Sequence, residues 1–165
     1  MAKKNKKPCI EVAVGMLGRR DYSIFDMRQK LTQKEYPEEE IEQAITRLQG
    51  LEYLDDHKYA RHFVNDKGRL AGWGRMRIEL ALRQKKIADE AIEAALQQYE
   101  EKMTTGDVPT WTGRATELLE RKYGLFEGSL EAKDFQKRMN FLLRRGYDMD
   151  QARQALENTR HLPDA

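Results

Sequence analysis

The sequence predicts an all-α protein in which three tandem three-helix repeats stack into an elongated, curved array. Its 165 residues are 39% hydrophobic and 35% charged, whereas typical domains have about 45–50% and about 25%. Such a composition suits helices that have one apolar stripe and a wide charged face. No segment sustains an alternation of β-branched residues, so we predict no sheet.

An apolar pattern that recurs along the chain indicates the repeat. Five apolar positions reappear after 51 residues and again after a further 60 residues. The three sets are Leu31, Tyr36, Ile41, Ala44 and Ile45; Leu82, Ile87, Ile92, Ala95 and Leu96; and Leu142, Tyr147, Ala152, Ala155 and Leu156. A basic residue lies three positions after each repeated leucine, at Lys34, Lys85 and Arg145. A single triplet of helices is marginally stable, so stacked neighbours are expected to bury the remaining apolar faces.

Each unit is expected to open with one helix, at about residues 8–17, 55–70 and 110–122. The second helix of each unit then ends just before the second position of the repeated set, and the third helix begins just after that position. The apolar positions line the inner faces of both helices. The pattern therefore predicts nine helices in three triplets.

Capping signals support these helix starts. Ser23 and Asp148 each begin a four-residue stretch with the spacing of a capping box, closed by Asp26 and Gln151 respectively. Pro37 precedes three glutamates, and a proline followed by carboxylates is favoured at a first helical turn. We divide the chain into a flexible basic tail (1–8), a first repeat (9–54), a second repeat (55–103), a linker (104–109) and a third repeat (110–160).

Charge is distributed unevenly along the chain. Residues 35–56 hold eight acids and one base, whereas residues 57–87 hold nine bases and two acids. One interpretation is a set of solvated helix faces of alternating charge. The other is a basic surface for phosphates or an acidic partner, with a separate acidic surface beside it.

The sequence offers no constellation typical of an enzyme. His57 and His62 are five residues apart, so a helix would place them on different faces, and they are not expected to share a metal. Asp55 and Asp56 are explained equally well as an N-cap and a first-turn acid of a helix. No Ser/His/Asp or Cys/His arrangement stands out, and His161 is the only other histidine. We expect no catalytic activity, no metal and no cofactor.

The glycine pair in Gly72-Trp73-Gly74 does not make a phosphate-binding loop, since no strand precedes it and no Lys-Ser or Lys-Thr follows. An interhelical turn with a packed tryptophan is expected instead. Cys9 is the only cysteine, so an intramolecular disulfide cannot form. We find no signal-peptide cleavage pattern and no apolar run long enough to span a bilayer, and we predict a cytosolic protein.

The remaining candidates lie on the surface. Arginine clusters suit phosphates and carboxylates, because the planar guanidinium donates two hydrogen bonds at once. The repeat is expected to present two basic clusters in register, although charge that merely solvates a helix explains any single residue as well. The candidates are Arg75, Arg77, Arg83, Lys85 and Lys86 in the second unit and Lys137, Arg138, Arg144 and Arg145 in the third.

Several motifs, in their order and spacing, resemble those of the RecX family over about residues 12–156. They are Arg20-Asp21-Tyr22-Ser23, Leu31 with Lys34, Leu48 to Gly50, Tyr53-Leu54-Asp55-Asp56 with Tyr59-Ala60, Gly72-Trp73-Gly74 with Arg77-Ile78, Leu82 and Lys85, and Leu142-Leu143-Arg144-Arg145-Gly146-Tyr147. The chain departs from the family at Glu52 and Lys86, where a glycine is common. Since glycine eases a left-handed helix end, Lys86 is expected to alter its turn or to be slightly strained.

The resemblance implies a stack of three-helix repeats that binds in the helical groove of the filament of RecA recombinase on single-stranded DNA. It implies suppression of strand exchange, ATP hydrolysis and co-protease activity, by a protein that we expect to be monomeric. The alternative is a direct DNA-binding protein that uses its units as helix-turn-helix modules. The basic second unit favours weak affinity for single- or double-stranded DNA, whereas the acidic segment argues against DNA as the sole target.

Overall fold

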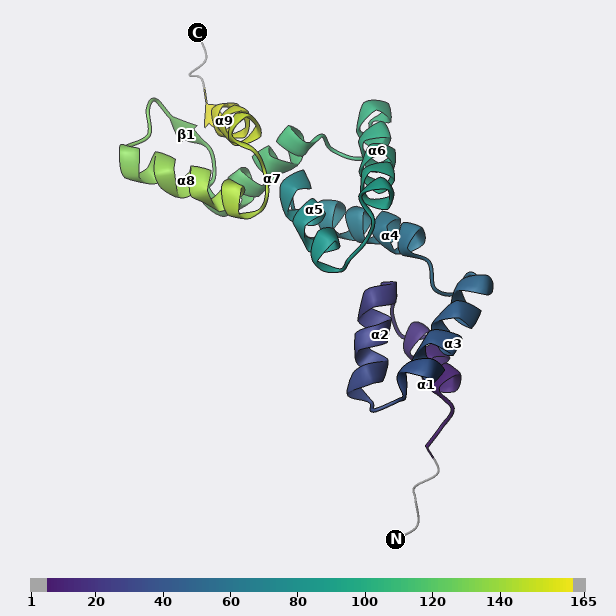
Figure 1. Cartoon of the computed structure of the whole chain (residues 1–165). Helices are drawn as coiled ribbons and strands as arrows, with labels where there is room; N and C mark the ends of the chain where they lie inside the picture. Colours follow the sequence, from purple (N-terminus) through teal and green to yellow (C-terminus); the bar gives the residue numbers. More distant parts are fainter. Residues whose placement is uncertain (1–5, 162–165) are drawn as a thin grey trace.

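The computed structural model describes residues 6–161, and in them nine helices form three consecutive units. Unit 1 contains α1 (Cys9–Leu17), α2 (Ile24–Gln33) and α3 (Glu38–Gly50). Unit 2 contains α4 (Asp56–Arg69), α5 (Arg75–Gln84) and α6 (Asp89–Thr105). Unit 3 contains α7 (Trp111–Tyr123), α8 (Ala132–Arg144) and α9 (Met149–Asn158). The units follow one another along an elongated, bent molecule, with units 1 and 3 at opposite ends (Figure 1). The predicted all-α class and the three tandem repeats are confirmed.

Every residue of the three repeated apolar sets is buried, and each unit uses the first two positions to close the same turn. In unit 1 the backbone N–H of Tyr36 donates to the carbonyl of Leu31 at 3.3 Å, and that of Glu35 to Thr32 at 2.8 Å. These bonds form a Schellman motif, which ends α2 and redirects the chain into α3. The corresponding pairs are Ile87 with Leu82 at 3.2 Å and Tyr147 with Leu142 at 3.3 Å.

The helix starts follow the predicted signals. The Ser23 hydroxyl accepts a hydrogen bond from the backbone of Asp26, and Asp148 with Gln151 completes a capping box. Asp55 caps α4 through two backbone N–H groups, so this acid has a structural partner. Pro37 is the N-cap of α3 and stands just outside the first turn.

The apolar core is divided in two. Units 2 and 3 share one continuous cluster of buried side chains, which extends from Ala60 to Leu156. Unit 1 has a separate cluster of its own, from Cys9 to Leu54. Stacking therefore buries the remaining apolar faces between units 2 and 3, whereas unit 1 completes its core alone.

Units 2 and 3 meet backbone against backbone. The N–H of Gly74 donates to the carbonyl of Arg145 at 2.7 Å, and that of Met76 to Gly146 at 3.1 Å. A Cβ on Gly74 would lie 2.4 Å from the carbonyl carbon of Gly146, so only glycine fits there. The Tyr147 hydroxyl also donates to the carbonyl of Gly72 at 3.1 Å. The Gly72-Trp73-Gly74 turn is thus the fixed joint between these units.

Units 1 and 2 meet through polar contacts. The Lys85 ammonium lies 2.6 Å from the carboxylate of Asp26, and His62 Nδ1 lies 2.6 Å from Asp21 Oδ2. The Asp56 carboxylate accepts a hydrogen bond from the backbone N–H of Ile24 at 2.9 Å. Neither apolar cluster extends across this joint. We therefore expect the joint of units 1 and 2 to be more deformable than the joint of units 2 and 3.

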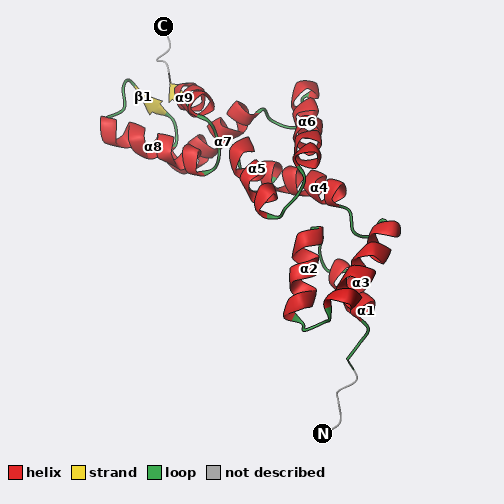
Figure 2. Ribbon diagram, viewed as in Figure 1, coloured by secondary structure: helices red, strands yellow, loops and turns green. Residues whose placement is uncertain are grey.

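Two predictions about irregular segments need correction. A short parallel pair, β1 (Phe126–Glu127) with β2 (Arg160–His161), forms where the loop after α7 meets the chain after α9 (Figure 2). Two residues per strand leave no periodicity for a sequence to display, which is why we predicted no sheet. The predicted linker is shorter, because α6 continues to Thr105 before Gly106 ends it in a left-handed cap.

The predicted flexible tail lies only partly within the described residues. Residues 1–5 fall outside them, but residues 6–8 contact unit 1. The Lys6 ammonium donates to the carbonyl of Glu35 at 2.9 Å and lies 4.2 Å from the centre of the Tyr36 ring. The Tyr36 hydroxyl donates to the carbonyl of Lys7 at 2.7 Å. Lys6 and Lys7 therefore contact the α2–α3 turn. The run of like charges in the sequence did not predict this contact.

Candidate functional site

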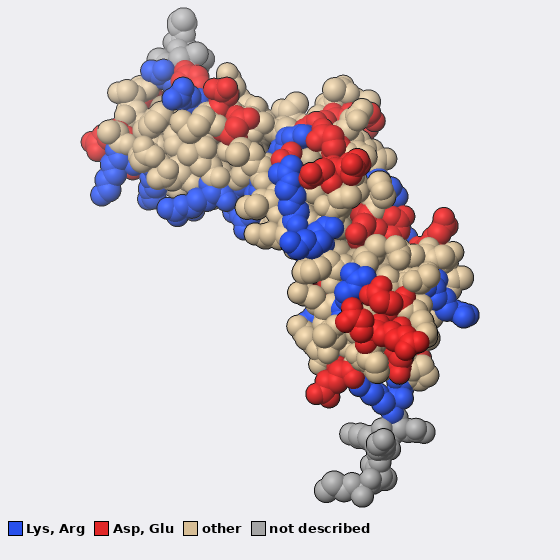
Figure 3. All heavy atoms as spheres, in the orientation of Figure 1, with Lys and Arg blue, Asp and Glu red and all other residues tan. Residues whose placement is uncertain are grey.

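A hollow of about 760 Å³ lies at the joint of units 2 and 3. The Gly72-Trp73-Gly74 turn and the start of α5 form one side, and the end of α7 with α8 forms the other. We call it the basic–aromatic hollow, and its lining residues are Ala71, Trp73, Arg77, Lys122, Tyr123, Lys137, Asn140, Phe141, Arg144 and Arg145. Five of these ten side chains are cationic and none is acidic. Lys and Arg atoms gather along the lower edge of units 2 and 3 in Figure 3.

The five cations are not neutralised within the part of the chain that the structure describes. None of them has a carboxylate within 4.0 Å among residues 6–161. Arg145 donates a hydrogen bond to the carbonyl of Ala71 at 3.0 Å, which fixes its side chain but leaves its charge unbalanced. Like charges gathered without counter-charges make a local positive potential, and this potential favours an anionic ligand.

Aromatic rings interleave with these cations. Arg77 lies 4.0 Å from the centre of the Trp73 ring, and Lys122 lies 4.2 Å from that of Phe141. Arg145 stands 4.9 Å from the Phe141 ring, which meets Tyr123 edge-on at 5.7 Å between centroids. All three rings are partly exposed. The hollow can therefore offer both charge and flat apolar surface to a ligand.

The nine predicted surface residues divide into groups. Arg77, Lys137, Arg144 and Arg145 line the hollow, and Arg138 lies beside it, over the rings of Tyr123 and Phe126. The structure does not bring the other four to the hollow. Those four are Arg75, Arg83, Lys85 and Lys86.

Three of the four residues outside the hollow are already paired. Arg75 contacts Glu79, Glu93 and Glu100 at 2.8 to 3.0 Å, and Arg83 contacts Glu79 and Asp89. Burial lowers the pKa of Arg75, but its hydrogen bonds to Glu100 and Glu93 outweigh this and raise the pKa overall. Arg75 is thus a charged residue whose ion pairs link α5 to α6.

The repeated basic position has a structural explanation. Lys85 of unit 2 contacts Asp26 of unit 1, and Arg145 of unit 3 contacts Ala71 of unit 2. Each of these two residues therefore ties its unit to the preceding one. The equivalent residue in unit 1 is Lys34. The basic residue therefore recurs at this position because it contacts the preceding unit, in addition to contributing to a basic surface.

Sequence reasoning missed Lys122 and the three rings Trp73, Tyr123 and Phe141 as part of the site. Lys122 lies at the end of α7, eighteen residues before Asn140 on α8. The available signal was the interleaving itself, since Lys122-Tyr123 and Phe141 with Arg144 alternate charge and aromatic character. This alternation identifies the site only once it is known that α7 and α8 both face the Gly72-Trp73-Gly74 turn.

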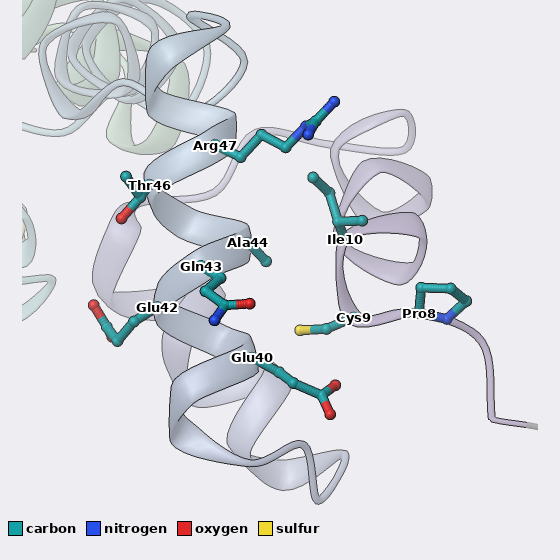
Figure 4. A pocket seen from close by; sticks show the side chains of 9 residues that line it. All are labelled: Pro8, Cys9, Ile10, Glu40, Glu42, Gln43, Ala44, Thr46 and Arg47. Carbon is teal, nitrogen blue, oxygen red and sulfur yellow. The ribbon is translucent and has the colours of Figure 1, made fainter.

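A different hollow, of about 710 Å³, lies between α1 and α3 of unit 1 (Figure 4). Cys9 and Ile10 of α1 face Ala44 of α3 across it, and Glu40 lies at its edge. Burial, followed by the charge of Glu40, raises the pKa of the Cys9 thiol. Because a thiolate is the reactive form, this cysteine is not activated as a nucleophile or metal ligand.

The chain matches three domain models of one family, in order along its length. These are the first RecX three-helix domain at residues 9–48, the second at 55–96 and the third at 113–156. The matched segments correspond to units 1, 2 and 3. No helix in residues 6–161 combines the length and apolar character that a membrane span requires.

Curated relatives and solved structures agree with these matches. The regulatory protein RecX of Vibrio parahaemolyticus is 33% identical over 159 residues, covering 94% of this chain and 96% of the relative. That of Trichlorobacter lovleyi is 33% identical over 153 residues, covering 90% and 94%. The crystal structure of RecX from Lactobacillus salivarius has a TM-score of 0.72 at 21% identity, covering 92% and 94%. Another regulatory protein RecX structure has a TM-score of 0.74 at 24% identity, covering 90% of this chain and 71% of that one.

Proposed function

The chain belongs to the RecX family of regulatory proteins, and we propose that it is a negative modulator of the RecA recombinase. In this proposal it binds in the helical groove of the RecA filament on single-stranded DNA and contacts neighbouring RecA subunits. Seated there, it lowers strand exchange, ATP hydrolysis and co-protease activity. The observation that carries the proposal is the ordered match of all three RecX domains to the three units.

The distribution of charge supports a surface-binding role. An elongated stack can follow a groove and contact more than one subunit of a repeating target. The cations of the basic–aromatic hollow, which have no carboxylate partner among residues 6–161, suit anionic groups, whereas the first turn of α3 presents Glu38, Glu39 and Glu40 at the other end of the molecule. Complementary patches of both signs fix the register of docking and suppress wrong partners.

The alternative, reading of duplex DNA by helix-turn-helix units, is less well supported. In that mode the N-terminal residues of the last helix of a unit enter the major groove. Here the last helices begin with acids: three glutamates in α3, Asp89 and Glu90 in α6, and Asp150 in α9. Carboxylates at those positions repel the phosphates that line the groove.

The proposal is tested by titrating the protein into RecA that is hydrolysing ATP on single-stranded DNA at moderate salt. We expect inhibition at protein concentrations well below that of the DNA sites, because action on the filament is transmitted between subunits. If hydrolysis falls only when enough protein is present to cover the DNA, the protein inhibits by competing with RecA for DNA, and action on the filament is rejected. No inhibition at any ratio rejects regulation of RecA.

A charge variant localises the docking surface. Reversing the charge of Arg75 or Lys85 would confound the result, because both residues form ion pairs within the fold. We therefore choose Arg77→Gln, Lys137→Gln and Arg144→Gln together, which remove three charges from the hollow that have no ion pair within the described residues. We expect weaker inhibition at an unchanged far-ultraviolet circular dichroism spectrum. Inhibition equal to that of the unmodified protein would exclude the hollow from the docking surface.

A further inference from the structure

We infer that the hollow between α1 and α3 of unit 1 is a docking site for a helix of a partner protein. The partner helix carries an apolar stripe, with a basic residue near one end of the stripe and an acidic residue near the other. The inference goes beyond the proposed function, because it concerns unit 1 alone and is tested without RecA. It rests on an open apolar face of α1, on the hollow of about 710 Å³ beside that face and on the charges at the two ends of the hollow.

The helix α1 is more apolar than its own packing explains. Glu11 is the single charged residue among the nine of α1, yet Cys9 and Ala13 alone are buried. Val14 is 46% exposed, and Ile10 is partly exposed. A helix that is apolar on all sides is normally covered on all sides. The core of unit 1 covers one face of α1, so a second cover is expected over Ile10 and Val14.

The hollow adjoins this open face. Ile10 borders the hollow together with Cys9 of α1 and Ala44 of α3, and Figure 4 shows these three side chains between the two helices. Val14 lies one helical turn after Ile10 and therefore on the same side of α1. A concave apolar seat that continues into an exposed apolar side chain suits the i and i+4 anchors of an amphipathic helix.

Opposite charges mark the two ends of the hollow. Glu40 lies at one end and Arg47 at the other, two turns further along α3 (Figure 4). Neither residue forms an ion pair within residues 6–161. Glu42 also borders the hollow, but Arg28 neutralises it at 2.7 Å. The complementary occupant therefore has a base at the Glu40 end and an acid at the Arg47 end.

A helix of another protein fits this hollow better than a second copy of the chain does. A two-fold axis would set the same patch against itself, so that hollow would face hollow and neither would be filled. A convex apolar stripe fills the hollow and covers Val14 in a single contact. The two charges also fix the direction in which the helix lies. We therefore place a partner helix along α1 and α3 rather than a dimer interface.

The experiment measures the fluorescence anisotropy of two labelled, alanine-based model peptides of about 15 residues, long enough to populate a helix. Both carry the same leucine stripe. The first has a lysine at one end of the stripe and a glutamate at the other, and the second has glutamate at both ends. We expect the unmodified protein to bind the first peptide about threefold more tightly, as one exposed ion pair would produce. No binding of either peptide at about 1 mM would reject the docking site.

A charge reversal locates the contact. Glu40→Lys should exchange the preference, so that the peptide with two glutamates binds about threefold more tightly than the other. A variant that fails to fold cannot produce an exchanged preference. Glu101→Lys is the matched control, since it makes the same change in net charge at an exposed acid of α6 in unit 2. If Glu40→Lys keeps the original preference, or if Glu101→Lys exchanges it too, the inference is overturned.

A second pair of variants tests the apolar contact. Val14→Gln should weaken the binding of both peptides about fivefold, because the valine side chain is no longer available to be buried on docking. Leu80→Gln replaces a leucine that is 58% exposed on α5 and should leave both affinities unchanged. The far-ultraviolet circular dichroism spectrum checks that both variants keep their helices. An unchanged affinity in Val14→Gln, or equal losses in both variants, would place the peptides elsewhere and overturn the inference.

Two further outcomes would identify a different occupant. If the peptide-free protein sediments as a dimer and Val14→Gln sediments as a monomer, a second copy covers α1 and the partner helix is rejected. If removal of residues 1–5 raises the affinity for the first peptide at least about tenfold, the chain's own N-terminal residues compete for the hollow as an intramolecular ligand. The inference would then be replaced by self-occupation of the hollow.

Discussion

Three non-glycine residues in the described chain have left-handed backbone conformations, and all three end helices. Glu35 and Lys86 have φ of 59° and 58° at the end of the second helix of their units, where Gly146 has φ of 91° in unit 3, and Glu52 has φ of 59° at the end of α3. An L-residue in this conformation costs about 1–2 kcal/mol relative to the right-handed one. The fold nevertheless forces it, because the Schellman bonds on either side fix the turn. The two departures from the family pattern, Glu52 and Lys86, therefore both fall on strained positions.

We predict that Lys86→Gly stabilises the body formed by units 2 and 3 by about 0.5–1 kcal/mol. Relief of the left-handed strain exceeds the entropy that glycine adds to the unfolded chain. Urea unfolding followed by tryptophan fluorescence measures the change. Lys86→Ala is the matched control, since it removes the charge but keeps a Cβ. If alanine stabilises as much as glycine does, relief of charge repulsion is the cause and strain is not.

A second prediction compares two glycines that share a left-handed conformation but differ in their surroundings. A Cβ on Gly146 would lie 2.4 Å from the backbone nitrogen of Arg77, whereas one on Gly106 would have no neighbour within 4 Å. Gly146→Ala should destabilise units 2 and 3 by about 1–3 kcal/mol more than Gly106→Ala does, because overpacking adds to backbone strain. If the two variants lowered the free energy of unfolding equally in urea, the contact between the units would accommodate the added methyl group without cost.

At the scale of the element, the two joints differ in the forces that hold them. Units 2 and 3 combine buried apolar side chains with backbone hydrogen bonds, including the bond from Gly74 to Arg145. Units 1 and 2 rely on ion pairs and on the Asp56 carboxylate. Burial raises the pKa of Asp56, and the hydrogen bond from Ile24 only partly offsets this. The stability contributed by such a group rises as pH falls toward its ordinary pKa.

The Lys85–Asp26 pair gives a prediction for the weaker joint. Burial lowers the pKa of Lys85, but the hydrogen bond to Asp26 and the nearby Tyr59 raise it overall above the ordinary 10.5. The contribution of the pair is therefore complete below pH 10.5 and is lost as pH rises through the folded-state pKa. A double-mutant cycle with Lys85→Met and Asp26→Asn should give a coupling of about 1 kcal/mol at pH 7. The coupling should fall at strongly alkaline pH; a constant value would contradict an ionic contact.

The sequence predicted the local parts of these elements better than the joints. Leu31 and Tyr36 were recognisable because a Schellman motif places its apolar pair five residues apart in every unit. The partners of Arg75 were not recognisable, since Glu93 and Glu100 lie 18 and 25 residues away and face it only when α5 and α6 are packed. For the same reason Arg75 was predicted as surface. Pairing within a fold is a property of tertiary geometry, which residue spacing does not encode.

At the scale of the whole molecule, the divided core predicts that unit 1 unfolds separately. Its lone Cys9 is buried in the smaller cluster, and both tryptophans, Trp73 and Trp111, belong to the larger body. In a urea titration we expect Cys9 to become accessible to a thiol reagent before tryptophan fluorescence changes. Its raised pKa slows labelling at neutral pH, so the reaction should be followed above pH 8 with an unfolded control. Coincident transitions would show that the polar joint couples the two bodies fully.

If the protein binds a repeating target, as we propose, the unequal joints have a consequence for how it is held there. Once units 2 and 3 are attached, unit 1 stays within reach of the adjacent position, so its binding is intramolecular and is governed by an effective concentration. A stiff joint would set that concentration near zero whenever the spacing of the target did not match. If the polar joint that includes Asp26 and Asp56 deforms as we expect, the protein would tolerate targets whose repeat changes in pitch. In that case the avidity of the whole chain would depend on one small ionic interface rather than on the area of either end.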